Sequence, residues 1–383
     1  MGHRMYISGH FWGHRMVDLI RSATLAHFAE VARSVGIEPA KMLRRARLPL
    51  ACLSDQNMRI AVESVRRLLE ASATAAGVED FGLRMAERGG LANMGTVGLV
   101  VREQATLGAA IEALARFIHI QSDAMRVEIE RRDGVITIDM LLRIRHQRAK
   151  RQSIEYAVGR LHAIIRSLLG GDWRPLEVHF VHSPPRNRRH HRYFFGCDVI
   201  FDSDRDAILC AASDMSRPIP TAEPLIASYL RSRVEAIDVR PKAWDDKVGE
   251  LVHSLLSNGL CTIERVAECL ACDRRTIHRH LLDCGTSYSA ILDAQRTDLV
   301  LRLIEDGNRP LAGIAELLGF SAQSAMARWF RGRFGCSVSQ WRNGIRPKAL
   351  TTLSSRGVAS KSRSTSKTKR PPVSVRRSNR LGR

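Results

Sequence analysis

Three features of common protein classes are missing from the sequence, and each absence narrows what the protein can be. No run of eighteen apolar residues occurs, so no segment is long enough to span a membrane as a helix. The first twenty residues carry scattered His and Arg without a continuous apolar stretch, which argues against a secretory signal peptide. The eight cysteines form no paired framework, as expected in a reducing compartment. We therefore expect a cytoplasmic protein with no membrane partner.

Motifs of common enzymes are also missing. The sequence has no G-x-G-x-x-G after a predicted strand, no phosphate loop of the form G-x-x-x-x-G-K and no H-E-x-x-H. These absences exclude the usual dinucleotide, nucleotide-phosphate and zinc-peptidase sites. We predict that the protein is not an enzyme and has no cofactor.

Two groups of residues could suggest a metal, and both have a simpler interpretation. Cys269 and Cys272 form a C-x-x-C, but Cys269 falls within a predicted helix, whereas the ligand pairs of structural zinc sites lie on turns. Small buried thiols are the better interpretation. His190 and His191 precede Cys197, but the surrounding arginines would repel a cation, so a solvated basic turn is predicted there. No metal site is expected.

The balance of charge points to a polyanionic partner. Lys and Arg number 60 against 39 Asp and Glu, which gives a formal net charge of +21. Nucleic acid is the first candidate for such a basic chain and an anionic membrane surface the second. Residues 346–383 contain twelve basic residues and no acidic one. This tail cannot bury a core, and it could hold phosphates without reading sequence.

The same local pattern occurs twice near the C-terminus, in residues 262–282 and 311–331. Each copy reads as a helix, a short turn and a second helix, with an alanine (Ala267, Ala315) where the two helices must cross closely. The turns are predicted at residues 271–273 and 319–321. Two ordinary helical hairpins with solvated faces are the alternative, but the duplicated turn chemistry favours two helix-turn-helix units.

The second helix of each copy has a predicted buried face and a predicted exposed face. Asp273 and Ser321 are the predicted N-caps, because their side-chain oxygens can accept a bond from a free backbone N–H. The residues predicted to point inward are Ile277, Leu281, Leu282, Met326, Trp329 and Phe330. The predicted base contacts, which point outward, are Arg275, His278, Arg279, Gln323, Ser324 and Arg328. Arg and Gln are side chains that read base edges in a major groove.

This segment resembles the DNA-binding domain of the AraC/XylS-type bacterial transcription regulators. The residues that carry the likeness are Ile314, Ala315, Leu318, Gly319, Phe320, Ser321, Arg328, Phe330, Phe334, Gly335, Ser337, Trp341 and Arg342. Met326 and Val338 depart from the family, which usually has an aromatic residue and a proline there. The resemblance implies seven helices, with a linking helix near residues 289–304 that holds two recognition helices about one DNA turn, ~34 Å, apart.

The N-terminal half mixes helices and strands. Helical patterns cover residues 23–87 and begin again at Thr106, and a long helix is predicted over residues 147–169. Strands are predicted at residues 125–130 and 135–142, joined by a turn that contains Asp133 and Gly134. A further strand is expected at residues 176–181, and residues 199–201 and 207–210 look like a closing strand pair. Trp173 and Tyr156 could line a ligand pocket, although such aromatics are more often core residues.

This order of elements resembles the arabinose-binding-like effector domain that a subgroup of AraC/XylS regulators carries. The likeness rests on Gly95, Gly98, residues 106–110, Pro175, His182, Pro184, Pro185 and residues 194–197. The resemblance implies a domain that senses a small molecule, dimerises, or does both. It does not identify the molecule.

Together these patterns predict a mixed architecture, with an α+β N-terminal effector domain and an all-α C-terminal domain. The expected boundaries are an uncertain extension at residues 1–22, the effector and dimerisation domain at 23–238, the DNA-binding domain at 239–345 and the basic tail at 346–383. The expected partners are double-stranded DNA, a small-molecule effector, RNA polymerase and a second copy of the chain. The expected place is the cytoplasm, associated with the nucleoid.

The predicted function is sequence-specific DNA binding that regulates transcription, with the choice between activator and repressor left open. The alternative is an effector-independent DNA-organising protein, for which the basic tail is the motivating feature. A DNA-repair methyltransferase fused to AraC-type helices is a third possibility. It would bring a Pro-Cys-His-Arg nucleophile and a four-cysteine zinc site, and neither occurs in the sequence.

Overall fold

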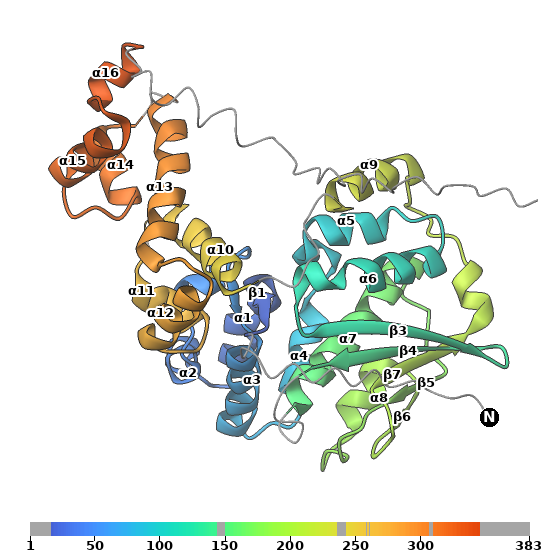
Figure 1. Cartoon of the computed structure of the whole chain (residues 1–383). Coiled ribbons are helices and arrows are strands. Elements are labelled where there is room, and N and C mark those ends of the chain that lie inside the picture. Colours follow the sequence, from blue (N-terminus) through green and yellow to red (C-terminus); the bar gives the residue numbers. More distant parts are fainter. Residues whose placement is uncertain are drawn as a thin grey trace, which may run out of the picture. The chain divides into compact units, whose positions relative to one another are not determined.

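The computed structural model describes residues 17–143, 150–235, 243–257, 259, 261–305 and 309–344 (Figure 1). The chain divides into two compact units, one up to Ser321 and one from Ala322 onward. The first sixteen residues, the basic tail and the predicted domain boundary near residue 239 lie outside the described residues. Within the described residues the architecture is mixed α and β followed by helices only, as the sequence predicts.

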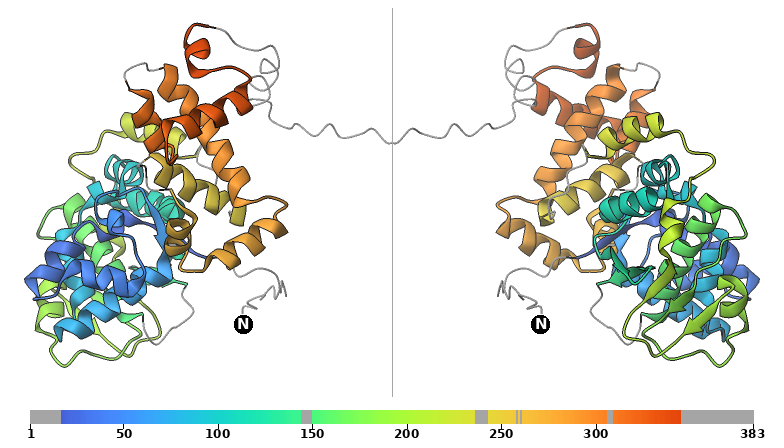
Figure 2. Two further views of the ribbon diagram at one scale, coloured as in Figure 1. Left: turned by 90° about the vertical axis from the view of Figure 1, so that its left-hand side faces the viewer. Right: turned by 90° about the vertical axis from the view of Figure 1, so that its right-hand side faces the viewer.

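The N-terminal part begins with a short strand pair and continues as helices. Strand β1 (Leu19–Arg21) pairs antiparallel with β2 (Arg59–Ala61), so residues placed in the extension by sequence belong to the folded domain. The elements of this part are η1 (Ser22–Leu25), α1 (Phe28–Ser34), α2 (Pro39–Ala46), η2 (Leu50–Leu53), α3 (Val62–Ala76), α4 (Phe81–Arg88), η3 (Leu91–Met94), α5 (Thr96–Arg102) and α6 (Leu107–Gln121). Their blue and teal ribbons lie beside the green sheet (Figure 2).

The main sheet has five strands in the order β3-β4-β7-β5-β6. The strands are β3 (Met125–Arg132), β4 (Val135–Leu142), β5 (Glu177–His179), β6 (Asp198–Ile200) and β7 (Ala207–Ala211). Among the described strands, only β5 and β6 pair in parallel. Side chains of the sheet, of α6 and of the long helix α7 (Arg151–Leu169) share one hydrophobic core, which buries Leu114, Phe117, Ile138, Met140, Leu161 and Ile164.

The predicted hairpin and the predicted helix cap are both present. Asp133 and Gly134 have φ values of 51° and 79°, the left-handed pair that a two-residue hairpin turn requires. Along β4 the side chains alternate between buried and less buried, because one face of the strand lies on the core. Helix α6 is capped by Thr106, whose hydroxyl accepts a hydrogen bond from the backbone N–H of Ala109 at 3.3 Å.

Two sequence predictions in this part were wrong. Residues 199–201 and 207–210 do not form a strand pair, because β5 lies between β6 and β7 and pairs with both. Short apolar runs carry no information on which strand is the neighbour. The segment around His190 is not a solvated turn but the helix α8 (Arg189–Phe195), in which His191 is fully buried. The long helix begins at Arg151, and residues 147–149 of its predicted range lie outside the described residues.

Helices α4 and α7 approach closely because two glycines face the contact. A Cβ atom at Gly82 would lie 2.0 Å from the carbonyl oxygen of Gln152, and one at Gly159 would lie 2.8 Å from the Cβ of Ala86. The Gln152 side chain also accepts a hydrogen bond from the Gly82 N–H at 2.8 Å. This contact fixes α7, which carries many of the side chains discussed below.

The C-terminal part contains seven helices within the described residues, the number that the family resemblance implies. They are α10 (Trp244–Ser257), α11 (Ile263–Cys269), α12 (Arg274–Asp283), α13 (Tyr288–Glu305), α14 (Leu311–Leu317), α15 (Gln323–Phe334) and α16 (Val338–Arg342). Before them, η5 (Ala212–Ser216) and α9 (Pro224–Glu235) follow the sheet. The predicted linking helix is confirmed as α13. The first five of the seven helices belong to the first unit, and α15 and α16 to the second.

Candidate nucleic-acid interface and ligand cavity

The first repeated segment folds as a helix, a turn and a second helix. Thr262 caps α11, and its side chain accepts a hydrogen bond from the Arg265 N–H at 3.2 Å. The turn contains Ala271, which has a φ of 52°. Asp273 caps α12, as predicted, by accepting from the Thr276 N–H at 2.7 Å. Local side-chain to backbone bonds therefore define where both helices start.

The buried face of α12 differs from the prediction at one position. Ile277 and Leu281 are fully buried as expected, but Leu282 is 75% exposed. At 3.6 residues per turn, Leu282 lies about 140° around the helix from Ile277, so both cannot share one narrow stripe. His280 takes the place instead, buried and stacked on Trp244 of α10 with ring centroids 4.2 Å apart.

The opposite face of α12 carries three predicted base contacts, Arg275, His278 and Arg279, and all three are exposed. Among the described residues, their side chains form no hydrogen bond or salt bridge. Arg274, one position away, instead pairs with Glu264 of α11 at 2.9 Å. On α12, Arg274 is therefore held by an ion pair, whereas Arg275, His278 and Arg279 are available to a partner.

The second repeated segment begins with α14 and a tight turn. Ile314 and Ala315 are buried, and Gly319 has a φ of 70°, which favours glycine. Arg296 of α13 holds this turn. Its guanidinium donates to the carbonyl oxygens of Leu318 at 2.8 Å and Gly319 at 3.0 Å.

Helix α15 begins one residue later than the turn predicts, at Gln323. Its N-cap is Ala322, without a side-chain cap, so the prediction of Ser321 as N-cap was wrong. A serine near a turn is compatible with several helix starts, and the packing of the helix selects among them. Met326 and Phe330 are fully buried as predicted, and Trp329 is partly buried.

Within the second unit an aromatic cluster joins α15 to α16. The Phe330 and Phe334 rings lie 4.4 Å apart, and Phe334 lies 5.2 Å from Trp341. Val338, where the family usually has proline, is the first residue of α16, whose capping box is formed by Ser337 and Gln340. The remaining predicted base contacts, Gln323, Ser324 and Arg328, are exposed on α15 and form no side-chain hydrogen bond or ion pair among the described residues. Because α12 and α15 belong to different units, their spacing of one DNA turn stays a prediction.

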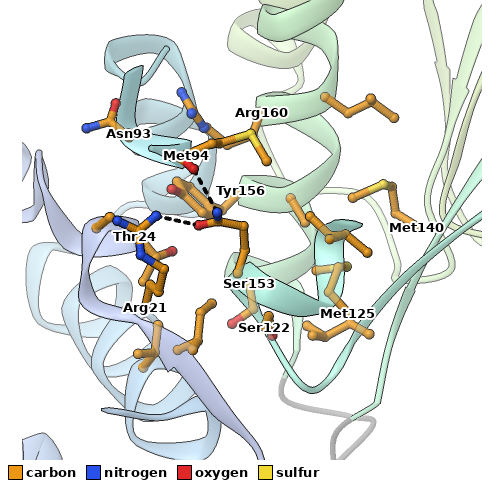
Figure 3. A pocket seen from close by; sticks show the side chains of 18 of the residues that line it. Arg21, Thr24, Asn93, Met94, Ser122, Met125, Met140, Ser153, Tyr156 and Arg160 are labelled. Carbon is orange, nitrogen blue, oxygen red and sulfur yellow. Dashed lines mark hydrogen bonds between the residues drawn. The ribbon is translucent and has the colours of Figure 1, made fainter. Parts of the chain in front are cut away.

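A cavity of about 130 Å³ lies in the N-terminal part of the first unit (Figure 3). Its lining is mostly apolar and comes from β1, η1, α3, η3, α6, α7 and the β3–β4 hairpin. The apolar side chains include Val65, Leu69, Leu114, Met125, Met140, Leu161 and Ile164. A cavity of about 150 Å³ with apolar walls can hold benzene, so the volume suits a small organic molecule.

One end of the cavity is polar. The Arg21 guanidinium donates to the side-chain oxygen of Gln121 at 2.9 Å, and Gln121 donates to the carbonyl oxygen of Met94 at 2.8 Å, as the dashed lines in Figure 3 show. Arg160 of α7 donates to the carbonyl oxygen of Gly90 at 2.6 Å. Arg21 and Asn93 are drawn on one side of the view, and Met125 and Met140 on the other.

Sequence reasoning suggested only part of this lining. Tyr156 lines the cavity, whereas Trp173 is a buried core residue whose indole N–H donates to Asp214 at 3.1 Å. Arg21 and Arg160 were missed. Arg160 did leave a signal, because it is a charged residue on the apolar stripe of α7, four positions before Ile164.

Glu155 marks a second buried polar cluster, on α7. Its carboxylate is fully buried and lies 3.0 Å from Arg151, 3.1 Å from His191 and 3.4 Å from His182. His190 forms hydrogen bonds with Asp80 and Glu87 instead. These contacts bring together titratable groups from distant parts of the chain.

The described residues contain no cluster of His, Cys, Asp or Glu that could hold a metal ion. Cys269 is buried in α11, and burial raises the pKa of its thiol to about 12. Burial likewise raises the pKa of Cys272 to about 11. Among the described helices, none is both long and apolar enough to cross a membrane.

Comparisons with known proteins agree with this geometry. Residues 36–219 match the family described as the arabinose-binding domain of AraC transcription regulators, N-terminal, and residues 266–344 match a helix-turn-helix domain family. The HTH-type transcriptional regulator VirS of Mycobacterium tuberculosis is 28% identical over 331 residues, which cover 85% of this chain and 96% of VirS. The ornithine utilization regulator of Pseudomonas aeruginosa is 24% identical over 327 residues, with the same two coverages of 85% and 96%.

Among solved structures, the transcriptional regulator CdpR from Pseudomonas aeruginosa covers 80% of this chain and 96% of its own, at 20% identity and a TM-score of 0.38. A structural similarity this low adds nothing to the family assignment. The family assignment rests on the two family matches, which follow the order of the α+β part and the helical part along the chain. It rests also on the regulators that align over most of the sequence. The chain therefore belongs to the AraC/XylS-type transcription regulators with an arabinose-binding-like N-terminal domain, and it is a DNA-binding transcriptional regulator.

Proposed function

We propose that the protein recognises a specific DNA site through six side chains on two recognition helices. Arg275, His278 and Arg279 lie on α12, and Gln323, Ser324 and Arg328 lie on α15. The observation that supports this proposal is that all six are exposed while the opposite faces of both helices are buried. Arg, Gln and His can bond base edges in the major groove, and other Lys and Arg side chains bind phosphates and set the register.

We further propose that a small-molecule effector in the N-terminal cavity changes the population that is competent to bind DNA. Ser122 lines the cavity, and the next residue, Asp123, pairs with Arg59 at 2.7 Å. Asp123 also lies 3.4 Å from the ammonium group of Lys247, on the first helix of the C-terminal part. A ligand that moves the segment around Ser122 would act on this ion pair, which belongs to the first unit throughout.

The same proposal includes the oligomeric state, the protein partner and the place of action. The regulator acts as a homodimer, contacts RNA polymerase at promoter-proximal sites and associates with the nucleoid in the cytoplasm. It acts by binding and catalyses no reaction, in keeping with relatives that are transcriptional regulators. The basic tail adds affinity for phosphates that depends on salt and not on sequence.

The test is a binding experiment with DNA from the upstream region of the protein's own gene and with random DNA, across a series of salt concentrations. The intact chain is compared with a form that ends at residue 345 and with Arg328→Ala. Arg333→Ala is the matched control, because Arg333 is also exposed on α15 but lies about 140° around the helix from Arg328.

We expect the shortened form to keep a ratio of specific to random affinity of about a thousand or more. Arg328→Ala should weaken specific binding by about 1–3 kcal/mol and leave random binding nearly unchanged. Arg333→Ala should change both affinities alike or neither. If all forms bind every DNA equally and the tail carries the affinity, the protein organises DNA without reading it, and the proposal of specific recognition fails.

A further inference from the structure

The cavity of the N-terminal part has an unusual charge balance. Its lining contains two arginines, Arg21 and Arg160, and no Asp or Glu. Among the described residues neither guanidinium forms an ion pair with a carboxylate. A buried charge without a counter-ion is costly, and an arginine cannot relieve the cost by losing its proton. The lining of the cavity therefore has an excess of positive charge, which an anionic ligand would compensate.

Arg160 has the more enclosed guanidinium of the two. The residue is only 7% exposed, and its Nη2 donates to the Gly90 carbonyl oxygen at 2.6 Å. Its Nη1 is buried and has no hydrogen-bond partner among the described residues. The group fits because residue 89 is glycine, since a Cβ atom there would lie 2.0 Å from Nη1. A buried donor without an acceptor is uncommon in proteins and calls for a partner.

Arg21, at the end of β1, also lines the cavity. Its two Nη atoms bond only neutral amide oxygens, those of Gln121 at 2.9 Å and Asn57 at 2.7 Å. Burial lowers the pKa of Arg21, the charge of Arg59 lowers it further, and the charge of Asp55 partly opposes both effects. Tyr156 also lines the cavity, and its hydroxyl has no hydrogen-bond partner within the described residues. Three polar side chains with unused hydrogen-bond donors thus border a cavity whose lining is otherwise mostly apolar.

We propose that the cavity takes a small organic acid with a compact hydrocarbon body, and that its carboxylate binds at the end bordered by Arg21, Arg160 and Tyr156. A planar guanidinium can bind a carboxylate through two parallel hydrogen bonds, which gives strength and orientation. The hydrocarbon body then lies among the apolar side chains toward Met125 and Met140 (Figure 3). This inference rests on the proposed function, because it names the chemical class of the effector.

The test uses three probes of one shape, cyclohexanecarboxylate, cyclohexanecarboxamide and cyclohexylamine, and the full-length protein. Calorimetric titration gives the affinity of each probe. We expect the acid to bind about tenfold or more tightly than the amide, because hydrogen bonds to a charged group are stronger than neutral ones. The amine should bind more weakly than the amide.

Arg160→Met and Arg21→Met test the location of the carboxylate. Each should lower the affinity for the acid about tenfold and leave that for the amide unchanged. Tyr156→Phe should lower it less. The control is Arg166→Met, on the same helix α7, because Arg166 bonds the carbonyl oxygen of Gly171 and does not line the cavity. Far-UV circular dichroism and binding to random DNA show that each variant folds.

Three results with the wild-type protein would overturn the ligand class: equal affinities for acid and amide, a preference for the amine, or no binding of any probe. None of these results requires a variant to fold. The proposed location of the carboxylate is wrong if both arginine variants keep the full preference for the acid. The proposed function fails separately, if the acid binds with the expected preference but leaves the affinity for specific DNA unchanged.

Discussion

The guanidinium carbon of Arg296 lies 4.1 Å from the centre of the Phe320 ring. Arg296 comes from the linking helix α13, and Phe320 from the turn that follows α14. The same guanidinium bonds the carbonyl oxygens of Leu318 and Gly319, so one side chain binds three consecutive residues of the turn. Arginine suits this position because its flat fork can stack on a ring while it donates in its own plane.

Arg296→Ala should therefore destabilise the C-terminal helices by about 1.5–3 kcal/mol, the usual effect of removing hydrogen bonds to a charged group. It should also weaken specific DNA binding more than random binding, because the turn precedes α15, which we propose as the second recognition helix. Urea unfolding followed by circular dichroism measures the first effect. Arg302→Ala, at an exposed position of α13, is the control and should change neither quantity.

Thr106→Ala should lower the free energy of unfolding by about 1 kcal/mol, the typical loss when a helix N-cap is removed. The Thr106 hydroxyl accepts from the Ala109 N–H, and alanine leaves that N–H without its partner. Thr106→Ser keeps the hydroxyl and should retain most of the stability. Equal losses in the two variants would show that the methyl group of Thr106, and not the cap, matters there.

Glu155→Gln should destabilise the N-terminal part strongly, by about 3–5 kcal/mol. The change keeps the shape of the side chain but removes the buried charge that faces Arg151 at 3.0 Å and His191 at 3.1 Å. Glu177→Gln is the matched control, because Glu177 pairs with His179 at a half-exposed site and its loss should cost little. Similar unfolding midpoints for the two variants would mean that the cluster around Glu155 is not energetically important.

The pair Asp80 and His190 should make stability depend on pH. The hydrogen bond to Asp80 raises the pKa of His190 above its ordinary value of 6.5, and the bond to Glu87 adds to the rise. Burial alone would raise the pKa of Asp80, but the hydrogen bonds from His190 and Arg84 outweigh it and lower that pKa below its ordinary value.

A raised histidine pKa stabilises the fold fully below pH 6.5, and this contribution is lost as the pH rises through the raised value. The lowered pKa of Asp80 acts at the other end, where stability is lost as the pH falls below the ordinary value of 3.8. The difference in unfolding free energy between wild type and His190→Gln should thus be largest near pH 5 and shrink toward about pH 9. A constant difference across this range would contradict the charged pair.

Much of the helical C-terminal part follows from local sequence signals. The predicted helix at residues 289–304 is α13 (Tyr288–Glu305), and Asp273 caps α12 as its position indicates. Such features depend on residues within one or two turns of each other, so the sequence shows them directly. Leu282 shows the limit of this reasoning. The sequence pattern placed Leu282 on the buried face. In the folded chain His280 packs on Trp244 instead, and Leu282 is exposed.

By itself, the sequence determined the family, the two classes of domain, the duplicated helix pairs and the exposure of the six side chains that we propose contact DNA. Tertiary structure alone decided that β5 separates β6 from β7, that His191 is buried and that Arg21 and Arg160 border one cavity. The physical reason is sequence separation. Helix periods and caps arise between near neighbours, whereas strand order, buried charge and cavities depend on residues that only the folded chain brings together.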